Sequence, residues 1–153
     1  MVEIAYSTVM DVTLSWDKLK HVKNYQDKAG DLIFTRLFEI EPSAKKLFQF
    51  SETGDVHDNA KYATHAKQMV DMIDCAVATL GPDMEPLEEE LMRLGKRHLT
   101  HYGVTSRYLP VMEKAVIFAM EELLDSKFTR QDRNAWQVVF HFMVKKMVEG
   151  MEQ

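Results

Sequence analysis

The chain has 153 residues, of which 46% are hydrophobic and 28% charged, and these values predict one soluble globular domain over residues 1–153. Its formal net charge of −5 disfavours nonspecific binding to nucleic acid or to an anionic membrane surface. Cys75 is the only cysteine, so no intrachain disulfide can form, and without a leader segment or a bilayer-length apolar run we expect a cytoplasmic protein.

Helices are expected along the whole chain, because six glycines and four prolines leave few breaks and no β-hairpin pattern occurs. The first two predicted helices cover about residues 8–23 and 26–40. Thr8 and Asp11 form a capping-box pattern at the start of the first helix. Pro42 then bends the chain and opens a short third helix that ends near Phe48.

Four more helices are predicted after a polar loop at residues 49–57. A long one spans about 58–80, and the next begins at Pro86 and stops at Gly103, a plausible left-handed position. The last two cover about 107–124 and 130–150, and Thr129 with Asp132 forms a capping box for the final helix. The sequence therefore predicts an all-α protein of about seven helices.

Two histidines lie on apolar helix stripes where a leucine would be expected. His65 falls on the stripe of the long helix at 58–80. His98 continues the stripe formed by Leu87, Leu91 and Leu94, at steps of four, three and four residues. Two inward-facing imidazoles on separate helices, in a chain with eleven methionines, suggest that the two side chains bind a metal cofactor between them. The iron of a haem fits best.

His98 is the stronger candidate for a metal ligand. The carbonyl of Leu94, four residues earlier, can accept a hydrogen bond from one ring nitrogen and leave the other free for a metal. Lys96 and Arg97 could contact the carboxylates of a cofactor. A histidine satisfied within the core is the alternative. A zinc site using His98 and His101 lacks the further ligands, usually cysteines, that structural zinc requires.

His65 needs a partner if it is buried, because an unpaired imidazole costs a few kcal/mol in an apolar environment. A bound gas or the metal itself could serve, and a histidine at the surface edge is the alternative. Cys75 has no evident base beside it, so we expect a small buried apolar residue. No catalytic triad and no Gly-rich phosphate loop can be read from the sequence.

Taken in chain order, the histidines and the aromatic residues around them resemble the globins over nearly the whole length of the chain. The sequence around these positions is similar to neuroglobin-like and other single-domain globins. The spacing supports this, since 17 residues separate Phe48 from His65 and 33 separate His65 from His98. The matching positions are Trp16, Phe34, the run Phe38–Pro42, Phe48, His65, Met69, His98, Phe128, Thr129, Ala135 and Trp136.

The resemblance implies a globin fold around a haem b pocket, with the short fourth helix absent. His98 would be the proximal ligand of the iron. His65 would be the distal residue, which either strengthens the binding of a gas by donating a hydrogen bond or binds the iron itself. Met69 is bulkier than the residue usual at its position. The implied cofactor contacts are Phe34, Phe48, His65, Gln68, Met69, Leu94, Arg97, His98, Tyr102 and Val104, with Arg97 and Tyr102 placed for the propionates.

The function implied by the resemblance is reversible binding of O2, CO and NO, with oxygen storage or transport as the leading role. Nitric oxide dioxygenation or nitrite reduction is the enzymatic alternative, and it would need a separate reductase because the chain carries no flavin or nicotinamide domain. A gas or redox sensor and a helical protein that has lost haem are the remaining alternatives.

Overall fold

The structure is a computed structural model that describes residues 4–48 and 55–153. Every regular element in these two ranges is helical, which confirms the predicted all-α class. The α-helices are α1 (Tyr6–Lys20), α2 (Tyr25–Ile40), α3 (Tyr62–Thr79), α4 (Glu85–Tyr102), α5 (Leu109–Leu124) and α6 (Arg130–Met151). The 3-10 helices are η1 (Pro42–Phe48), η2 (Val56–Asp58), η3 (Ser106–Tyr108) and η4 (Asp125–Lys127).

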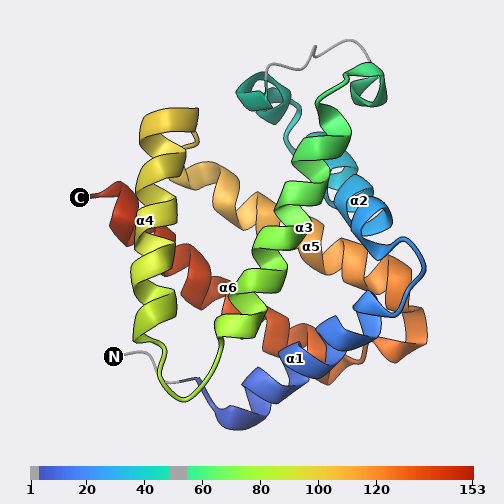
Figure 1. The fold of residues 1–153 in the computed structure, drawn as a ribbon, viewed down its shortest axis with the longest axis vertical. Coiled ribbons are helices and arrows are strands. Elements are labelled where there is room, and N and C mark those ends of the chain that lie inside the picture. The colour runs from blue at the N-terminus through green and yellow to red at the C-terminus, as the bar shows by residue number, and fades with distance from the viewer. Residues whose placement is uncertain (1–3, 49–54) are drawn as a thin grey trace.

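The helices pack on one another without forming flat layers. α4 packs chiefly on α6, α2 packs on α3 and α5, and α1 packs on α6. Figure 1 shows α3 running through the middle of the molecule, with α4 to one side, α2 to the other, and α5 and α6 behind. The two histidine-bearing helices, α3 and α4, therefore each rest on different partners.

Two buried tryptophans tie α1 to α6 and α3. The Trp16 and Trp136 rings lie 5.9 Å apart, and both side chains are almost fully buried. Trp136 Nε1 donates to Ser15 Oγ at 2.7 Å, and Trp16 Nε1 donates to Asp74 Oδ1 at 2.8 Å. Because a buried N–H without a partner costs about 1–3 kcal/mol, these two bonds let the large rings enter the core.

Glycines allow the backbones of α4 and α6 to touch. A Cβ added at Gly95 would lie 2.0 Å from the carbonyl oxygen of Met147, and one added at Gly150 would lie 1.9 Å from that of Met92. Because both obstacles are backbone atoms, no side-chain movement could relieve the clash. The pair of glycines thus fixes how closely α4, which carries His98, approaches α6.

The predicted start of the first helix is wrong. The helix begins at Tyr6, with Ala5 as the N-cap and no side-chain cap, and the N–H of Val9 donates to the Ala5 carbonyl. Ile4 packs partly against the core, and this contact favours an earlier start than the Thr8 and Asp11 pattern indicated. The first helix also ends at Lys20, three residues earlier than expected.

The long helix also starts later than predicted, at Tyr62 rather than near residue 58. The Asp55 side chain accepts a hydrogen bond from the His57 N–H, and this bond caps the separate turn η2. Asn59 is extended after it, so the helix cannot be continuous with η2. Between η1 and α3, the described residues contain no helix other than this three-residue turn, and residues 49–54 of the predicted loop lie outside the described ranges.

The capping box predicted for the last helix is confirmed. Thr129 Oγ1 accepts from the Asp132 N–H at 3.1 Å, and the Asp132 carboxylate accepts from the Thr129 N–H at 3.0 Å. Pro86 and Pro110 likewise occupy the first turns of α4 and α5, where a missing N–H is tolerated.

Replacing Thr129 by alanine is expected to lower the free energy of unfolding by about 1 kcal/mol, because the Asp132 N–H loses its acceptor. Urea denaturation at pH 7 measures this change. Thr129→Ser, which keeps the hydroxyl, is the control and should stay close to wild type. Equal stability of the alanine variant and wild type would show that the cap contributes nothing.

Candidate functional site

His98 lies near the C-terminal end of α4 with one ring nitrogen already engaged. Its Nδ1 lies 2.8 Å from the carbonyl oxygen of Leu94. Because a carbonyl only accepts, Nδ1 must carry the hydrogen, and in the neutral ring the lone pair then belongs to Nε2. The bond predicted from the sequence is therefore present, and it leaves the tautomer suited to bind a metal through Nε2.

The backbone of His98 is held as firmly as its ring. Gly103 ends α4 in the left-handed region with φ of 68°, as predicted, and its N–H donates to the His98 carbonyl. The N–H of Val104 donates to the same oxygen at 2.9 Å. The Tyr102 ring packs edge-on against the imidazole at 5.6 Å between centroids. These contacts fix where the ring of His98 lies on the end of the helix.

The environment of His98 favours the neutral ring. The side chain is half-buried, and desolvation lowers the pKa of the imidazole below its usual value. The hydrogen bond to the Leu94 carbonyl opposes this change, and the nearby charge of Arg97 adds to it. A neutral imidazole is the form that ligates a metal.

His65 lies on α3 beside a cluster of aromatic rings. Its imidazole is half-buried, with the Phe48 ring at 5.6 Å between centroids in an edge-on arrangement. Phe48 in turn meets Phe34 edge-on at 5.1 Å and Phe38 at 6.1 Å. Phe34 is fully buried, so it backs Phe48 rather than standing at the surface. The cluster joins α2, the end of η1 and α3 beside His65.

The remaining predicted contacts divide by exposure. Met69, Leu94 and Val104 are half-buried, on α3, on α4 and directly after α4. Gln68, Arg97 and Tyr102 are exposed on the same two helices. The apolar side chains among these contacts thus retain some accessible surface, and the polar side chains are more exposed to solvent.

Sequence reasoning missed two groups of residues around the site. The Tyr62 hydroxyl donates to Asp31 Oδ1 at 2.7 Å, which joins α3 to α2 beside Phe34. Nothing in the sequence links Tyr62 to a carboxylate 31 residues away. The second is Gly95, which lies against the backbone of α6; a glycine inside a helix pattern is the signal that could have indicated this close packing.

The predicted burial of Cys75 is wrong. The residue is exposed on α3, whose buried face consists of Tyr62, Ala66, Val70, Ile73 and Val77. Cys75 lies two residues from both Ile73 and Val77, so it points away from that face of the helix.

The residues present fit a haem-type group better than a self-contained metal site. Over residues 4–48 and 55–153, no three His, Cys, Asp or Glu side chains gather to hold a metal ion. His98 instead offers one nitrogen with its second nitrogen already bonded. The half-buried apolar side chains of Phe48, Met69 and Leu94 suit the flat apolar face of a porphyrin, which brings its own ligands for iron.

A model of the globin family matches residues 31–147 of the chain. The chain belongs to the globin family. Neuroglobin of Danio rerio is 29% identical over 125 residues, which cover 79% of this chain and 77% of that protein. Neuroglobin-1 of Oncorhynchus mykiss is 28% identical over 145 residues, which cover 91% of this chain and 87% of that protein. The predicted resemblance to neuroglobin-like globins is therefore confirmed.

A solved structure with the same fold is the "hexacoordinated heme protein" of an anhydrobiotic tardigrade at pH 4. The TM-score is 0.84 at 21% identity, and the match covers 98% of this chain and 96% of that one. This likeness shows that the helices are arranged as in a globin. Membership of the globin family supports haem-based binding of small gases by this chain.

Within the described parts of this globin, no helix has the length and apolarity needed to cross a membrane.

Proposed function

We propose that this globin would hold haem b through His98 and that the bound iron would reversibly bind O2, and also CO and NO. Oxygen storage or transport is the role we assign, in the cytoplasm, where a lone cysteine fits a reducing environment. The single observation that carries the proposal is the bond from His98 Nδ1 to the Leu94 carbonyl, because it leaves Nε2 as the one nitrogen that can bind iron.

The cofactor contacts expected from the sequence have distinct tasks in this proposal. Phe48, Met69 and Leu94 exclude water from the haem faces, while Arg97 and Tyr102 meet the propionates from the exposed edge of α4. Bound haem supplies the iron at which the gases bind. Phe34 lies behind Phe48 and keeps that ring in place.

We further propose that His65 would be a second protein ligand of the iron when haem is bound, and that it would give way to a gas. Phe48 packs against the His65 ring at 5.6 Å, so the ring already has a defined position on the inner side of α3. The tardigrade protein of the same fold, which is described as a hexacoordinated heme protein, supports the same arrangement here.

His65→Leu is expected to change the deoxygenated ferrous spectrum from sharp, split visible bands to a broad band. CO should bind this variant more than about tenfold faster than it binds wild type. The iron position that His65 would occupy is open in nearly every molecule of the variant but in only a minor fraction of wild-type molecules. Absorption spectra and stopped-flow mixing with CO make the measurement. His101→Leu, at an exposed histidine of α4, is the control.

A wild-type spectrum identical to that of His65→Leu would show that His65 does not bind the iron at rest. Sustained NO consumption in the presence of a separate reductase, at rates above those of simple oxygen-bound globins, would replace the storage role with the enzymatic one.

A further inference from the structure

One carboxylate oxygen links three parts of the chain at the start of the distal helix. Asp31 Oδ1, on α2, lies 2.7 Å from the Tyr62 hydroxyl on α3 and 2.5 Å from His57 Nε2 on η2. The Thr35 hydroxyl, one turn further along α2, lies 3.4 Å from the same oxygen. Asp31 is therefore the common acceptor of the segments that lead into α3.

His57 is held between two carboxylates. Its Nε2 faces Asp31, and its Nδ1 lies 2.6 Å from Asp55 Oδ1. Ionised carboxylates only accept hydrogen bonds, whereas a neutral imidazole has a single N–H. Both bonds can therefore exist together only while both ring nitrogens carry hydrogen. We name the group Asp31, Asp55, His57 and Tyr62 the acid clasp.

The surroundings of the clasp are acidic on balance. Asp31 faces His57 from α2, Asp55 faces it from the segment before η2, and the Tyr62 ring lies 4.9 Å from its ring on α3. Lys45 of η1 is the cation near Asp55. Glu39 of α2, paired with Arg36, is a further charged group at the cavity beside the clasp.

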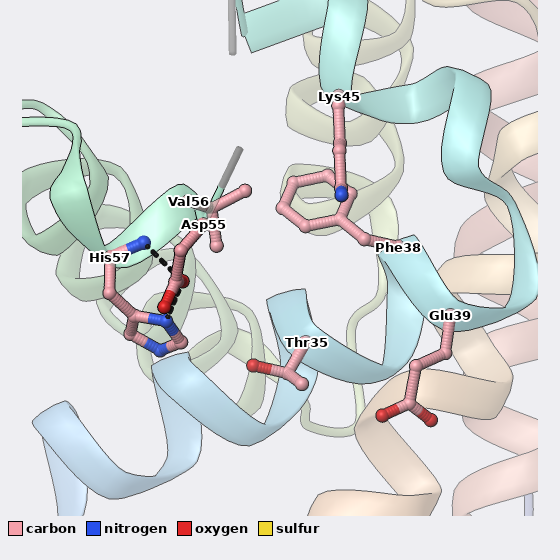
Figure 2. Close-up of a pocket in the computed structure, with 7 residues that line it drawn as sticks. All are labelled: Thr35, Phe38, Glu39, Lys45, Asp55, Val56 and His57. Carbon is pink, nitrogen blue, oxygen red and sulfur yellow. Dashed lines mark hydrogen bonds and ion pairs between the residues drawn. The ribbon is translucent and has the colours of Figure 1, made fainter. Parts of the chain in front are cut away.

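A cavity of about 220 Å³ lies beside this clasp. Figure 2 shows the side chains of Asp55 and His57 turned toward each other on one side of the cavity, with Thr35, Phe38 and Glu39 of α2 on the other. Opening of the clasp thus has room to occur without a clash against α2.

Protonation of His57 is favoured by its partners. The hydrogen bonds that the ring donates to Asp55 and then to Asp31 raise the pKa of the His57 imidazole, and desolvation opposes them only in part. The bonds with the backbone N–H and the ring of His57 lower the pKa of Asp55. The charged forms of both groups therefore coexist over a wider pH range than in free side chains.

The acid clasp is connected to the distal histidine through α3 and its aromatic neighbours. Tyr62 begins α3 one turn before His65, and its ring packs edge-on against Phe34 at 6.2 Å. Phe34 contacts Phe48, which contacts His65. Tyr62 is thus connected to His65 both along the helix and through the rings.

We propose that Asp31 is a positioning residue for the distal helix, and that it holds the start of α3 fully only while His57 is protonated on both ring nitrogens. The effect on His65 as an iron ligand rests on the proposed function. The effect on α3 itself does not.

The direction of the pH effect follows from the raised pKa of His57. The clasp is complete below the usual histidine pKa, and it is lost as the pH rises through the raised value in the folded protein. Above that value one carboxylate no longer receives a hydrogen from the ring. The start of α3 should then open more often, and His65 should leave the sixth position more readily.

Hydrogen–deuterium exchange of the α3 backbone between about pH 6 and about pH 9, read by mass spectrometry and corrected for intrinsic rates, tests the clasp. In wild type, protection of residues 62–70 should fall severalfold as the pH rises. His57→Gln should remove this pH dependence. Asp31→Asn, which keeps an acceptor for Tyr62, should weaken protection at low pH, while His21→Gln, at the exposed residue that directly follows α1, should match wild type over residues 62–70.

Helix α6 is the internal reference, because its exchange should be the same in all four proteins if each is folded. A wild-type pH profile in His57→Gln, or wild-type protection in Asp31→Asn, overturns the clasp.

CO binding to the ferrous holoprotein tests the link to His65. The rate should rise severalfold with pH in wild type and stay constant in His57→Gln. Equal profiles in the two proteins overturn the link while leaving the exchange result standing. Failure to bind hemin at all would overturn the proposed function, and the exchange experiment on the same protein would still decide the clasp.

Discussion

His98→Ala is expected to lower haem affinity by more than about 100-fold, because loss of a supporting partner of a metal ligand alone costs 10–100-fold and here the ligand itself is removed. The variant should lose its haem to an acceptor protein in a period during which the wild-type protein keeps its haem. Transfer of haem to excess apomyoglobin, followed by absorption, measures the rate.

His101→Ala is the matched control, since this histidine lies three residues later on the same helix with an exposed side chain. It should retain haem like wild type. Added imidazole should restore a spectrum with axial nitrogen ligation to His98→Ala, because the truncated side chain leaves space for it. Normal haem retention by His98→Ala would overturn the assignment of the proximal ligand.

Gly95→Ala should lower the free energy of unfolding by about 3 kcal/mol or more, which is the opposite of its usual effect within a helix. The same change at an unobstructed helix position would stabilise by about 0.5–1 kcal/mol. Here the new methyl group would lie 2.0 Å from the carbonyl oxygen of Met147, so α4 and α6 must separate. Urea unfolding of the apoprotein measures the loss independently of haem.

Gly81→Ala provides the control for this substitution. Nothing lies within 4 Å of the Cβ that it would add, so its stability should be equal to or slightly above that of wild type. If Gly95→Ala were as stable as Gly81→Ala, α4 and α6 would not approach each other as closely as described. The conclusion that this contact supports the helix carrying His98 would then also be wrong.

Much of the fold and part of the site could be predicted because the responsible interactions are local. The capping box of Thr129 and Asp132, the left-handed end at Gly103 and the bond from His98 to Leu94 each join residues at most five apart. Such bonds depend on the helix itself and hardly on what packs against it. The spacing of Phe48, His65 and His98 then indicated the globin family, which the family match confirms.

Helix starts and side-chain directions were less predictable where a local pattern competes with packing. Thr8 carries a capping pattern, yet Ile4 packs on the core and the helix begins before it. Cys75 resembles a core residue by type, yet the register of α3 that buries Ile73 and Val77 leaves it exposed.

The sequence by itself determined the helices, most of their ends, and the two histidines on apolar stripes, because these follow from residue spacing along one helix. Only the tertiary structure decided that Gly95 and Gly150 bring α4 onto α6, and that Asp31 gathers His57 and Tyr62 from 26 and 31 residues away. Contacts of this kind depend on how whole helices cross, and a crossing is fixed by the shapes of many side chains packed together.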